Sequence, residues 1–388
     1  MKRKCGRRRS YDDMSESKCN RVFILGAGCS ANYGYPLGAK LVDELRQFLP
    51  KIPSGCPLIE GAVSKSIYLA SRFPEANTLD KLVNLPEGRF NAFRGGRGHA
   101  WQSADTHQEN LTDEEILNAK IATSALFLDN ETEARKKVLK GYKEYLFPAV
   151  FRQADCWQNA INDSDCSVFT FNYDRLFELA FLDYFRNSEG PYAIRQFALY
   201  GQSVLNSGFD PTLEWGRKRI AIKQGRFCFL KLHGSAGWWA RECKRPQQPQ
   251  KGEWRDYCSN SPQTPSDLVQ FEKFMAANKQ CYKWEPLIAF PHEKQLLTSD
   301  HPSDFIQGPY IGQVWSRAAE VLCQAIQVTV IGYSFAQIDR THMVENLLCK
   351  TPKTTQITIE NKDVEGVRNA LASYPDIKDR LTLIKKCF

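Results

Sequence analysis

Several apolar runs in this sequence end in residues that can bind or cleave a small molecule. The runs have the length of buried strands, and glycines, amides, carboxylates, hydroxyls and a histidine follow them. The endings are Gly26-Ala27-Gly28-Cys29-Ser30, Thr170-Phe171-Asn172-Tyr173-Asp174, Lys231-Leu232-His233-Gly234-Ser235, Phe290-Pro291-His292, Ile331-Gly332-Tyr333-Ser334-Phe335 and Ile359-Glu360-Asn361-Lys362. In an open parallel sheet the carboxyl ends of the strands share one edge, where ligands bind. We therefore expect these residues to converge on one site.

The first of these endings is a glycine turn that can receive a diphosphate. An apolar, partly β-branched run precedes the pattern Gly26-x-Gly28-x-x-Ala31. Glycines let the backbone turn sharply and bring its N–H groups close to phosphate oxygens. In an NAD-dependent dehydrogenase an acidic residue follows roughly 20 residues later, but Asp43 and Glu44 both fall in an expected helix, which disfavours that class. The same turn would also form if it merely joined a core strand to a helix.

Strands and helices must alternate to position these residues. We expect strands at 22–25, 166–171, 227–232, 286–290, 327–331, 356–359 and 381–384, and helices at 37–48, 60–72, 76–84, 112–128, 131–160, 174–185, 310–326, 336–349 and 363–374. This alternation predicts an α/β fold, with a Rossmann-like parallel sheet covered by helices on both faces. Residues 21–388 would form one such domain, in which 50–165 are a mostly helical insertion and 240–283 a surface excursion.

Composition is typical of a soluble globular protein. The chain is 42% hydrophobic and 25% charged, and it has no run of about 18 apolar residues that would predict a membrane span. Its 13 cysteines are scattered singly, which indicates reduced thiols in a cytoplasmic protein. The first ten residues supply six positive charges of the net +8. We expect residues 1–20 to form a disordered basic arm that is not a secretory signal; whether it binds nucleic acid is left open.

Four motifs resemble, in order, the NAD-binding core of sirtuins. They are Gly-Ala-Gly-x-Ser from Gly26, Thr-x-Asn-x-Asp from Thr170, His-Gly-Ser from His233 and Gly-x-Ser from Gly332. The chain is most similar to prokaryotic sirtuin-like NAD hydrolases of anti-phage defence, over residues 21–361 apart from the insertion and the excursion. The resemblance implies NAD as a substrate and a partner that could be a HerA-type hexameric ATPase. We also expect a homo-oligomer, because an unrestrained NAD hydrolase would exhaust its own cell and its activity should depend on assembly.

The resemblance also implies a role for each matching residue. Asn172 would bind the nicotinamide-side ribose or position a water, Asp174 would fix the loop or a ribose hydroxyl, and His233 would be the general base. The residues that bind the diphosphate and the adenosine would be Gly26, Ala27, Gly28, Ser30, Thr170, Gly332, Ser334 and Asn361, with Glu360 as an alternative to the last.

These residue types suit cleavage of the nicotinamide–ribose bond. Nicotinamide leaves a pyridinium as a neutral ring, so no acid has to protonate it, and the difficult species is an oxocarbenium-like ribose. A histidine can activate water near neutral pH, and an asparagine can hold that water without adding a charge. We expect an NAD⁺ glycohydrolase that yields nicotinamide and ADP-ribose, although cyclisation and base exchange share the same cation. The alternatives are a module that binds NAD or ADP-ribose without cleaving it, and a protein deacylase.

Three departures from the deacylating sirtuins disfavour that last alternative. Phe171 stands where they have glutamine, and Pro36-Leu37-Gly38 stands where they have Asp-Phe-Arg. The singly spaced cysteines cannot form their four-cysteine zinc ribbon, so no zinc is expected. Taken singly, Asn172 could be a helix cap and His233 a buried core histidine, but the ordered set favours the functional interpretation. We expect Cys29 to be a packing residue, whereas His292 and Glu293 could join the site or cap a loop.

Overall fold

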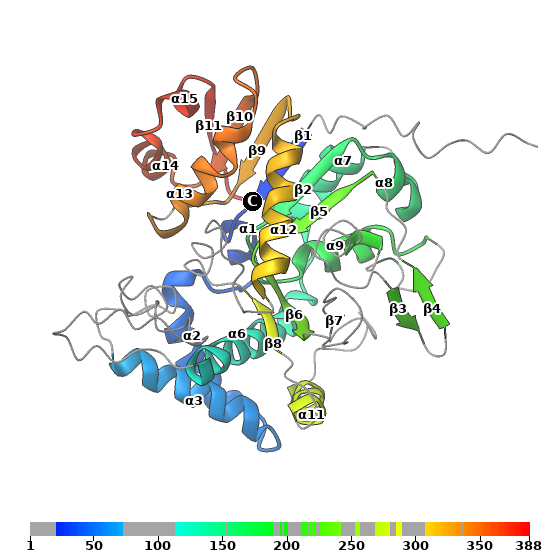
Figure 1. Ribbon diagram of the computed structural model, residues 1–388, viewed down its shortest axis with the longest axis vertical. Coiled ribbons are helices and arrows are strands. Elements are labelled where there is room, and N and C mark those ends of the chain that lie inside the picture. The colour runs from blue at the N-terminus through cyan, green and yellow to red at the C-terminus, as the bar shows by residue number, and fades with distance from the viewer. Residues whose placement is uncertain are drawn as a thin grey trace, which may run out of the picture.

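The computed structural model has a central parallel sheet. It describes residues 21–72, 113–152, 154–188, 195, 198–200, 212–215, 218–221, 226–241, 253–256, 268–279, 285–288, 307–335 and 337–388. Six strands lie in the order β11 (Leu381–Lys385), β10 (Gln356–Asn361), β9 (Gln327–Ile331), β1 (Arg21–Leu25), β2 (Cys166–Thr170) and β5 (Cys228–Lys231), and all neighbours are parallel. Helices lie on both faces (Figure 1), so the predicted Rossmann-like α/β fold is confirmed.

Three neighbouring strands, β1, β2 and β5, are buried on both faces. β2 and β5 are buried along their whole length, and in β1 only Arg21 is partly exposed. Continuous apolar strands of this kind require cover on both sides, as in other parallel sheets. The two edge strands differ: β5 is fully buried, whereas every residue of β11 is exposed or partly exposed.

The described helices connect these strands and cover the sheet. They are α1 (Gly28–Ala31), α2 (Leu41–Phe48), α3 (Pro57–Arg72), α6 (Asp113–Ala134), α7 (Phe147–Phe151), α8 (Trp157–Asp163), α9 (Leu176–Tyr184), α11 (Leu268–Lys279), α12 (Gln307–Leu322), α13 (Gln337–Glu345), α14 (Val364–Leu371) and α15 (Pro375–Lys378), with the 3-10 turns η2 (Gly38–Lys40), η3 (Leu49–Lys51) and η8 (Leu348–Lys350) and the π-helix η6 (Gly141–Leu146). Helix α12 crosses in front of the sheet in Figure 1 and contacts β5 and η8. None of the helices in these ranges is long and apolar enough to cross a membrane.

The insertion differs from the prediction in how its helices are divided. The helix expected at 112–128 continues to the end of α6, and the single helix expected at 131–160 is divided into η6, α7 and α8. Pro148 has no N–H to donate to the preceding turn, so the chain passes through a π-helix before α7 begins. Arg152, with φ 50°, ends α7. The helix expected at 76–84 and the basic arm at 1–20 lie outside the described residues.

The first predicted helix begins later than expected. Leu37 has an extended backbone, because Pro36 and Gly38 on either side of it disfavour a helix interior. The turn η2 then leads into α2. The buried apolar face of α2 is formed by Leu41, Val42, Leu45 and Phe48.

The strand predicted at 286–290 was wrongly assigned to the parallel sheet. Part of it forms β8 (Glu285–Ile288), which is antiparallel to β6 (Gly234–Arg241) in a separate sheet with β7 (Glu253–Asp256). Gly234, at φ +75°, turns the chain directly into β6, and a Cβ there would lie 1.8 Å from the carbonyl oxygen of Leu287. Only glycine permits this approach. The hairpin of β3 (Thr212–Trp215) and β4 (Lys218–Ala221) completes the described strands.

Helix α11 of the predicted excursion holds the first turn of α3. Buried Glu272 accepts hydrogen bonds from the backbone N–H groups of Leu58 (2.8 Å) and Ile59 (3.0 Å). These N–H groups have no partner within the helix, and a carboxylate also interacts favourably with the positive end of the helix dipole. The excursion and the insertion are therefore joined by a specific contact.

Candidate active site at the carboxyl edge of the sheet

The order of the strands reverses between β1 and β9. The chain continues from β1 to β2 on one side of this point and from β9 to β10 on the other. Open α/β sheets bind ligands beyond the carboxyl ends of the strands at such a reversal. The glycine turn after β1 and the turn at Gly332 after β9 meet there, so two predicted motifs that are far apart in sequence lie side by side.

The two turns are joined by backbone hydrogen bonds. The N–H of Gly26 donates to the carbonyl of Ile331 (2.9 Å), and the N–H of Gly28 donates to that of Gly332 (2.8 Å). A Cβ on Gly26 would lie 2.5 Å from Cα of Tyr333, and one on Gly28 would lie 2.8 Å from the oxygen of Gly332. Close packing of the turns therefore requires these glycines, whether or not a diphosphate binds.

A diphosphate contact by Gly26 and Gly28 stays a prediction, and it cannot use N–H groups that are already donated within the protein. Ala27 and Ser334 are the exposed residues of the two turns, whereas Gly28 and Gly332 are partly exposed. A ligand at this edge would meet these four residues first.

Asn172 connects the turn after β1 to the end of β2. Its Nδ2 donates to the carbonyl oxygen of Gly26 (3.0 Å) and to Oγ of Ser30 (3.0 Å), and its backbone N–H donates to Oγ1 of Thr170 (3.1 Å). Because a carbonyl oxygen can only accept, these contacts fix the orientation of the amide. Within the described part of the chain, Oδ1 of Asn172 has no hydrogen-bond partner. This oxygen is therefore the atom that can accept from a ligand or a water.

Ser30 extends the same chain of hydrogen bonds to Asp174. Its Oγ donates to Oδ2 of Asp174 (2.5 Å), and Oδ1 of Asp174 accepts from the N–H of Leu176 (3.0 Å) at the start of α9. Burial raises the pKa of Asp174, although Lys231 and the Ser30 hydroxyl act in the opposite direction. The Ser30 side chain is thus used within the site, and its predicted contact with a diphosphate stays a prediction.

His233 follows β5 at the same edge and is almost fully buried by aromatic rings. Its ring lies 4.9 Å from that of Phe171, 5.9 Å from that of Tyr173 and 6.5 Å from that of Trp315, measured between centroids. Phe171 and Tyr173 flank Asn172 in sequence, so the imidazole and the carboxamide belong to one group of residues. The indole of Trp315 also donates to the carbonyl of Leu232 (2.9 Å), which ties α12 to the residue before His233.

Asn361 at the end of β10 is bonded to the protein at both ends of its amide. Nδ2 donates to the carbonyl of Tyr333 (2.8 Å), and Oδ1 accepts from the N–H of Asp363 (2.9 Å). The neighbouring Glu360 accepts a hydrogen bond from the hydroxyl of Tyr145 (2.5 Å). Burial and this contact with Glu360 raise the pKa of Tyr145. The predicted contact of Asn361 or Glu360 with adenosine stays a prediction.

The predicted residues thus form two groups. The first is hydrogen-bonded and contains Gly26, Ser30, Thr170, Asn172 and Asp174, with His233 beside it. The second surrounds the turn after β9 and contains Gly28, Gly332, Ser334 and Asn361. Cys29 packs between them: its thiol donates to the carbonyl of Ile331 (3.2 Å), and burial raises its pKa well above the ordinary value, which fits a packing residue.

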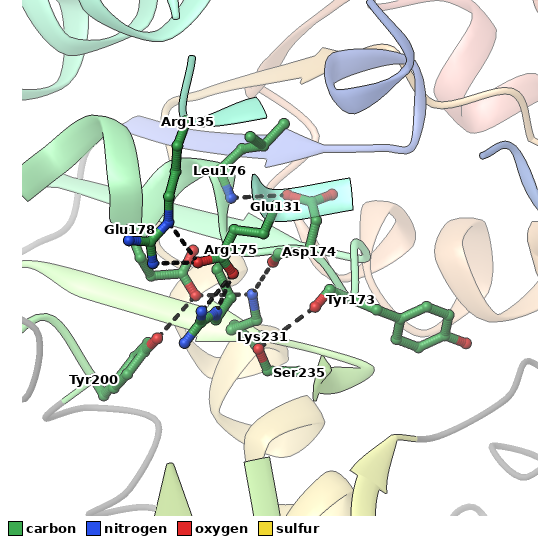
Figure 2. Close-up of polar contacts among 10 residues, drawn as sticks. All are labelled: Glu131, Arg135, Tyr173, Asp174, Arg175, Leu176, Glu178, Tyr200, Lys231 and Ser235. Carbon is green, nitrogen blue, oxygen red and sulfur yellow. Dashed lines mark hydrogen bonds and ion pairs between the residues drawn. The ribbon is translucent and has the colours of Figure 1, made fainter. Parts of the chain in front are cut away.

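The sequence analysis missed a buried ion pair beneath the site (Figure 2). Nζ of Lys231 lies 2.9 Å from Oε1 of Glu178 and donates to the backbone oxygen of Asp174 at 2.5 Å. The hydroxyl of Tyr200 donates to the same Glu178 oxygen (3.1 Å). A lysine inside the apolar run 227–232 was the available signal, because such a residue is buried only when it is paired.

A second buried cluster joins the insertion to the turn after β2 (Figure 2). Nε of Arg175 donates to Glu131 Oε2 (2.8 Å), and Nε of Arg135 donates to Glu131 Oε1 (3.0 Å). Burial works against the charge of Glu131, but the two guanidinium groups overcome it and lower the pKa of this carboxyl. Helix α6, which contains Glu131, and Arg135 directly after it are thereby fixed to the segment that contains Asn172.

Two other predicted candidates cannot be placed. His292 and Glu293 lie outside the described residues. In the ranges that the structure does describe, no group of three or more His, Cys, Asp or Glu side chains could hold a metal ion.

Comparison with known proteins gives no family for this chain. None of the protein-family models matches the sequence, and no curated protein matches it either.

Proposed function

We propose that this protein is an NAD⁺ glycohydrolase, which breaks the bond between C1′ of the ribose and N1 of nicotinamide. The observation that supports this most is the convergence of Asn172, Ser30 and His233 at the carboxyl edge, beside the reversal of strand order. An imidazole can act as a base, a fixed carboxamide can orient the ribose or a water, and a glycine turn can receive a diphosphate, so these groups suit hydrolysis of a dinucleotide at its ribose.

The proposed reaction needs a base but no acid for the leaving group. Nicotinamide departs with the electron pair of the broken C1′–N1 bond, which neutralises its ring. Water then adds to C1′ of the oxocarbenium-like ribose and releases a proton, which His233 takes up. The products are nicotinamide and ADP-ribose.

Asn172 would orient the ribose or the attacking water through Oδ1. Its Nδ2 is held by Gly26 and Ser30, so the amide cannot rotate away without breaking two hydrogen bonds. A group fixed before the substrate binds loses little entropy in the reaction. Asp174 holds Ser30 and the first turn of α9, and it would support Asn172 without touching the substrate.

The test is to incubate the purified protein with NAD⁺ and to separate the products by chromatography. We expect nicotinamide and ADP-ribose in equal amounts, and a rate about 10²–10⁴-fold lower for His233→Ala, as for the loss of a general base. Asn159→Ala is the control, because Asn159 is exposed on α8 and bonds only to Asp155 among the described residues. Tight binding of NAD⁺ without any product would instead support a binding module.

We extend the proposal to control of the activity. A hydrolase that acted without restraint would exhaust the NAD⁺ of its own cell. On the sirtuin-like resemblance, we propose that activity depends on homo-oligomer contacts and on a HerA-type ATPase partner in anti-phage defence. Assays with and without that partner, together with native mass spectrometry, test this. Full turnover by an isolated monomer would contradict the dependence on assembly while leaving the proposed reaction intact.

A further inference from the structure

The corner that holds His233 is fixed against the turn that holds Asn172 by four hydrogen bonds. Two come from backbone N–H groups: Leu232 donates to the carbonyl of Thr170 (2.9 Å), and Ala236 donates to that of Tyr173 (2.9 Å). The third comes from the side chain of Lys231, whose Nζ donates to the carbonyl of Asp174 (2.5 Å). The fourth comes from the hydroxyl of Ser235, which donates to the carbonyl of Tyr173 (3.5 Å). Of the two side-chain donors, Lys231 makes the much shorter hydrogen bond.

Lys231 is buried far more completely than its charge alone would allow. It is 0% exposed, and Glu178 is 1% exposed. Burying an ion pair costs desolvation energy, and the attraction between the two charges does little more than offset that cost. An apolar or neutral pair of similar volume would therefore make the folded protein about as stable. A stability role therefore does not explain why a lysine occupies this position in an otherwise apolar strand. Its contact with the Asp174 carbonyl gives a second reason.

We infer that Lys231 is a positioning residue of the site: by binding the carbonyl of Asp174, it sets the distance between His233 after β5 and Asn172 after β2. The inference rests on the proposed function for its kinetic part. Figure 2 shows the lysine between α9 and the turn, with the ring of Tyr173 directed away from it. Glu178 and Tyr200 hold the ammonium group in place from the other side.

The charge of Lys231 also lowers the pKa of Asp174, so the pH dependence of stability is a second way to detect their interaction. Asp174 is buried with a raised pKa, and Lys231 opposes that rise. The titratable groups that face Asp174 from the packed elements are Cys29, Tyr35, Tyr142, Glu178 and Lys231. Among them Lys231 is the one that favours the carboxylate. Its removal would therefore extend the pH range over which Asp174 stays protonated in the folded protein.

The experiment compares Lys231→Met, Glu178→Gln and the double variant Lys231→Met/Glu178→Gln. The single Lys231→Met leaves a buried carboxylate unpaired and is expected to lower Tm strongly. The double variant removes both charges and keeps an amide for Tyr200, so its Tm should return towards that of the wild type. Glu178→Gln also leaves a buried charge without its counter-ion, so its Tm should fall too, but it is the matched control for the contact because it keeps the lysine and its bond to the Asp174 carbonyl.

For NAD⁺ cleavage we expect the folded double variant to lose kcat on the order of 10²-fold, as for a small misplacement of reacting groups, with KM changed much less. Glu178→Gln should stay within a few-fold of the wild type. Relative to the wild type, the double variant should also lose more stability at about pH 7 than at about pH 4, because ionisation of Asp174 becomes harder. A folded double variant with wild-type kcat would overturn the inference.

A readout that needs no NAD⁺ separates this inference from the proposed function. Hydrogen exchange, followed by mass spectrometry, reports on the peptide that covers residues 170–176. We expect faster exchange there in the double variant than in Glu178→Gln, because the Asp174 carbonyl has lost its donor. If the wild type does not cleave NAD⁺ but this difference is observed, the proposed function fails and the positioning role stands. Equal exchange in the two variants would refute the positioning role directly.

Discussion

The two halves of the sheet edge use their polar residues differently. In the half formed by β1, β2 and β5, Ser30, Asn172 and Asp174 are buried and bonded to one another. In the half formed by β9, β10 and β11, Asn361 and Glu360 are also buried and bonded, but Ser334 is exposed and every residue of β11 is exposed or partly exposed. Groups that are fixed before a ligand arrives suit a chemical step, whereas exposed groups suit contact with an incoming ligand. On the proposed function, the first half would hold the reacting groups and the second would bind the rest of the dinucleotide.

The largest effect is expected from breaking the corner of the first half. Gly234→Ala places a Cβ 1.8 Å from the carbonyl oxygen of Leu287 at a residue with φ +75°. We expect it to lower the free energy of unfolding by at least about 3 kcal/mol. Gly61→Ala is the matched control, because no atom lies within 4 Å of its Cβ in α3, and it should raise stability by about 0.5–1 kcal/mol. Denaturant unfolding measures both, and equal stabilities would show that the corner is not tightly packed.

The two asparagines test the comparison by kinetics. Asn172→Ala should lower kcat of NAD⁺ cleavage by about 10²-fold, because the atom that orients the ribose or water is lost. Asn361→Ala removes two hydrogen bonds that hold the turn after β9, so it should raise KM and lower the free energy of unfolding by about 1–2 kcal/mol. Steady-state kinetics separates the two effects. A larger loss of kcat in Asn361→Ala than in Asn172→Ala would reverse the roles given to the two halves.

The two aspartates that flank β2, Asp174 after its carboxyl end and Asp165 before its amino end, should respond to pH in opposite directions. Burial raises the pKa of Asp174, so the folded state loses stability as pH rises above the unfolded value of about 3.9. Burial also acts on Asp165, but Arg21 and Arg152 lower its pKa, so its contribution is present above that value and lost as pH falls. The loss in free energy of unfolding, relative to the wild type, should therefore be smaller at about pH 7 than at about pH 4 for Asp174→Asn. For Asp165→Asn this loss should be larger at about pH 7 than at about pH 4. Urea unfolding at both pH values checks this, and the same trend for both variants would contradict it.

The smallest change in stability is expected from a substitution beside β10, in the second half of the sheet edge. Tyr145→Phe removes a partly buried hydrogen bond to Glu360 (2.5 Å) and should lower the free energy of unfolding by about 1 kcal/mol. Thermal unfolding measures the change. A loss as large as that of Gly234→Ala would mean that the second half is as tightly constrained as the first.

Local patterns in the sequence were sufficient to predict the parallel sheet, but they did not predict every element that packs against it. Apolar runs such as 166–171 and 327–331 predicted β2 and β9, because a strand buried on both faces is apolar throughout. The run 286–290 has the same composition, yet it forms β8 of another sheet, because the close approach of Gly234 and Leu287 decides its partner. No local pattern contains that information.

The same limit applies to the site. The order of motifs predicted that Asn172 and His233 would lie at one edge, since parallel strands end together. The side-chain amide of Asn172 bonds to residues more than 100 positions away, and Lys231 and Glu178 are also more than 50 positions apart. A charge in an apolar run shows that some partner exists, but its identity depends on the packing of β5 against α9. The contacts of Gly26 and Gly28 with the turn after β9 could likewise not be predicted from the glycine pattern.

The most direct test of the central claim is the release of nicotinamide from NAD⁺, followed over time with the wild-type protein and with His233→Ala at equal concentration. The account predicts steady release by the wild type and a rate about 10²–10⁴-fold lower for the variant, with both proteins equally folded by circular dichroism. Equal release by the two proteins, or none by the wild type in any assembly, would contradict it.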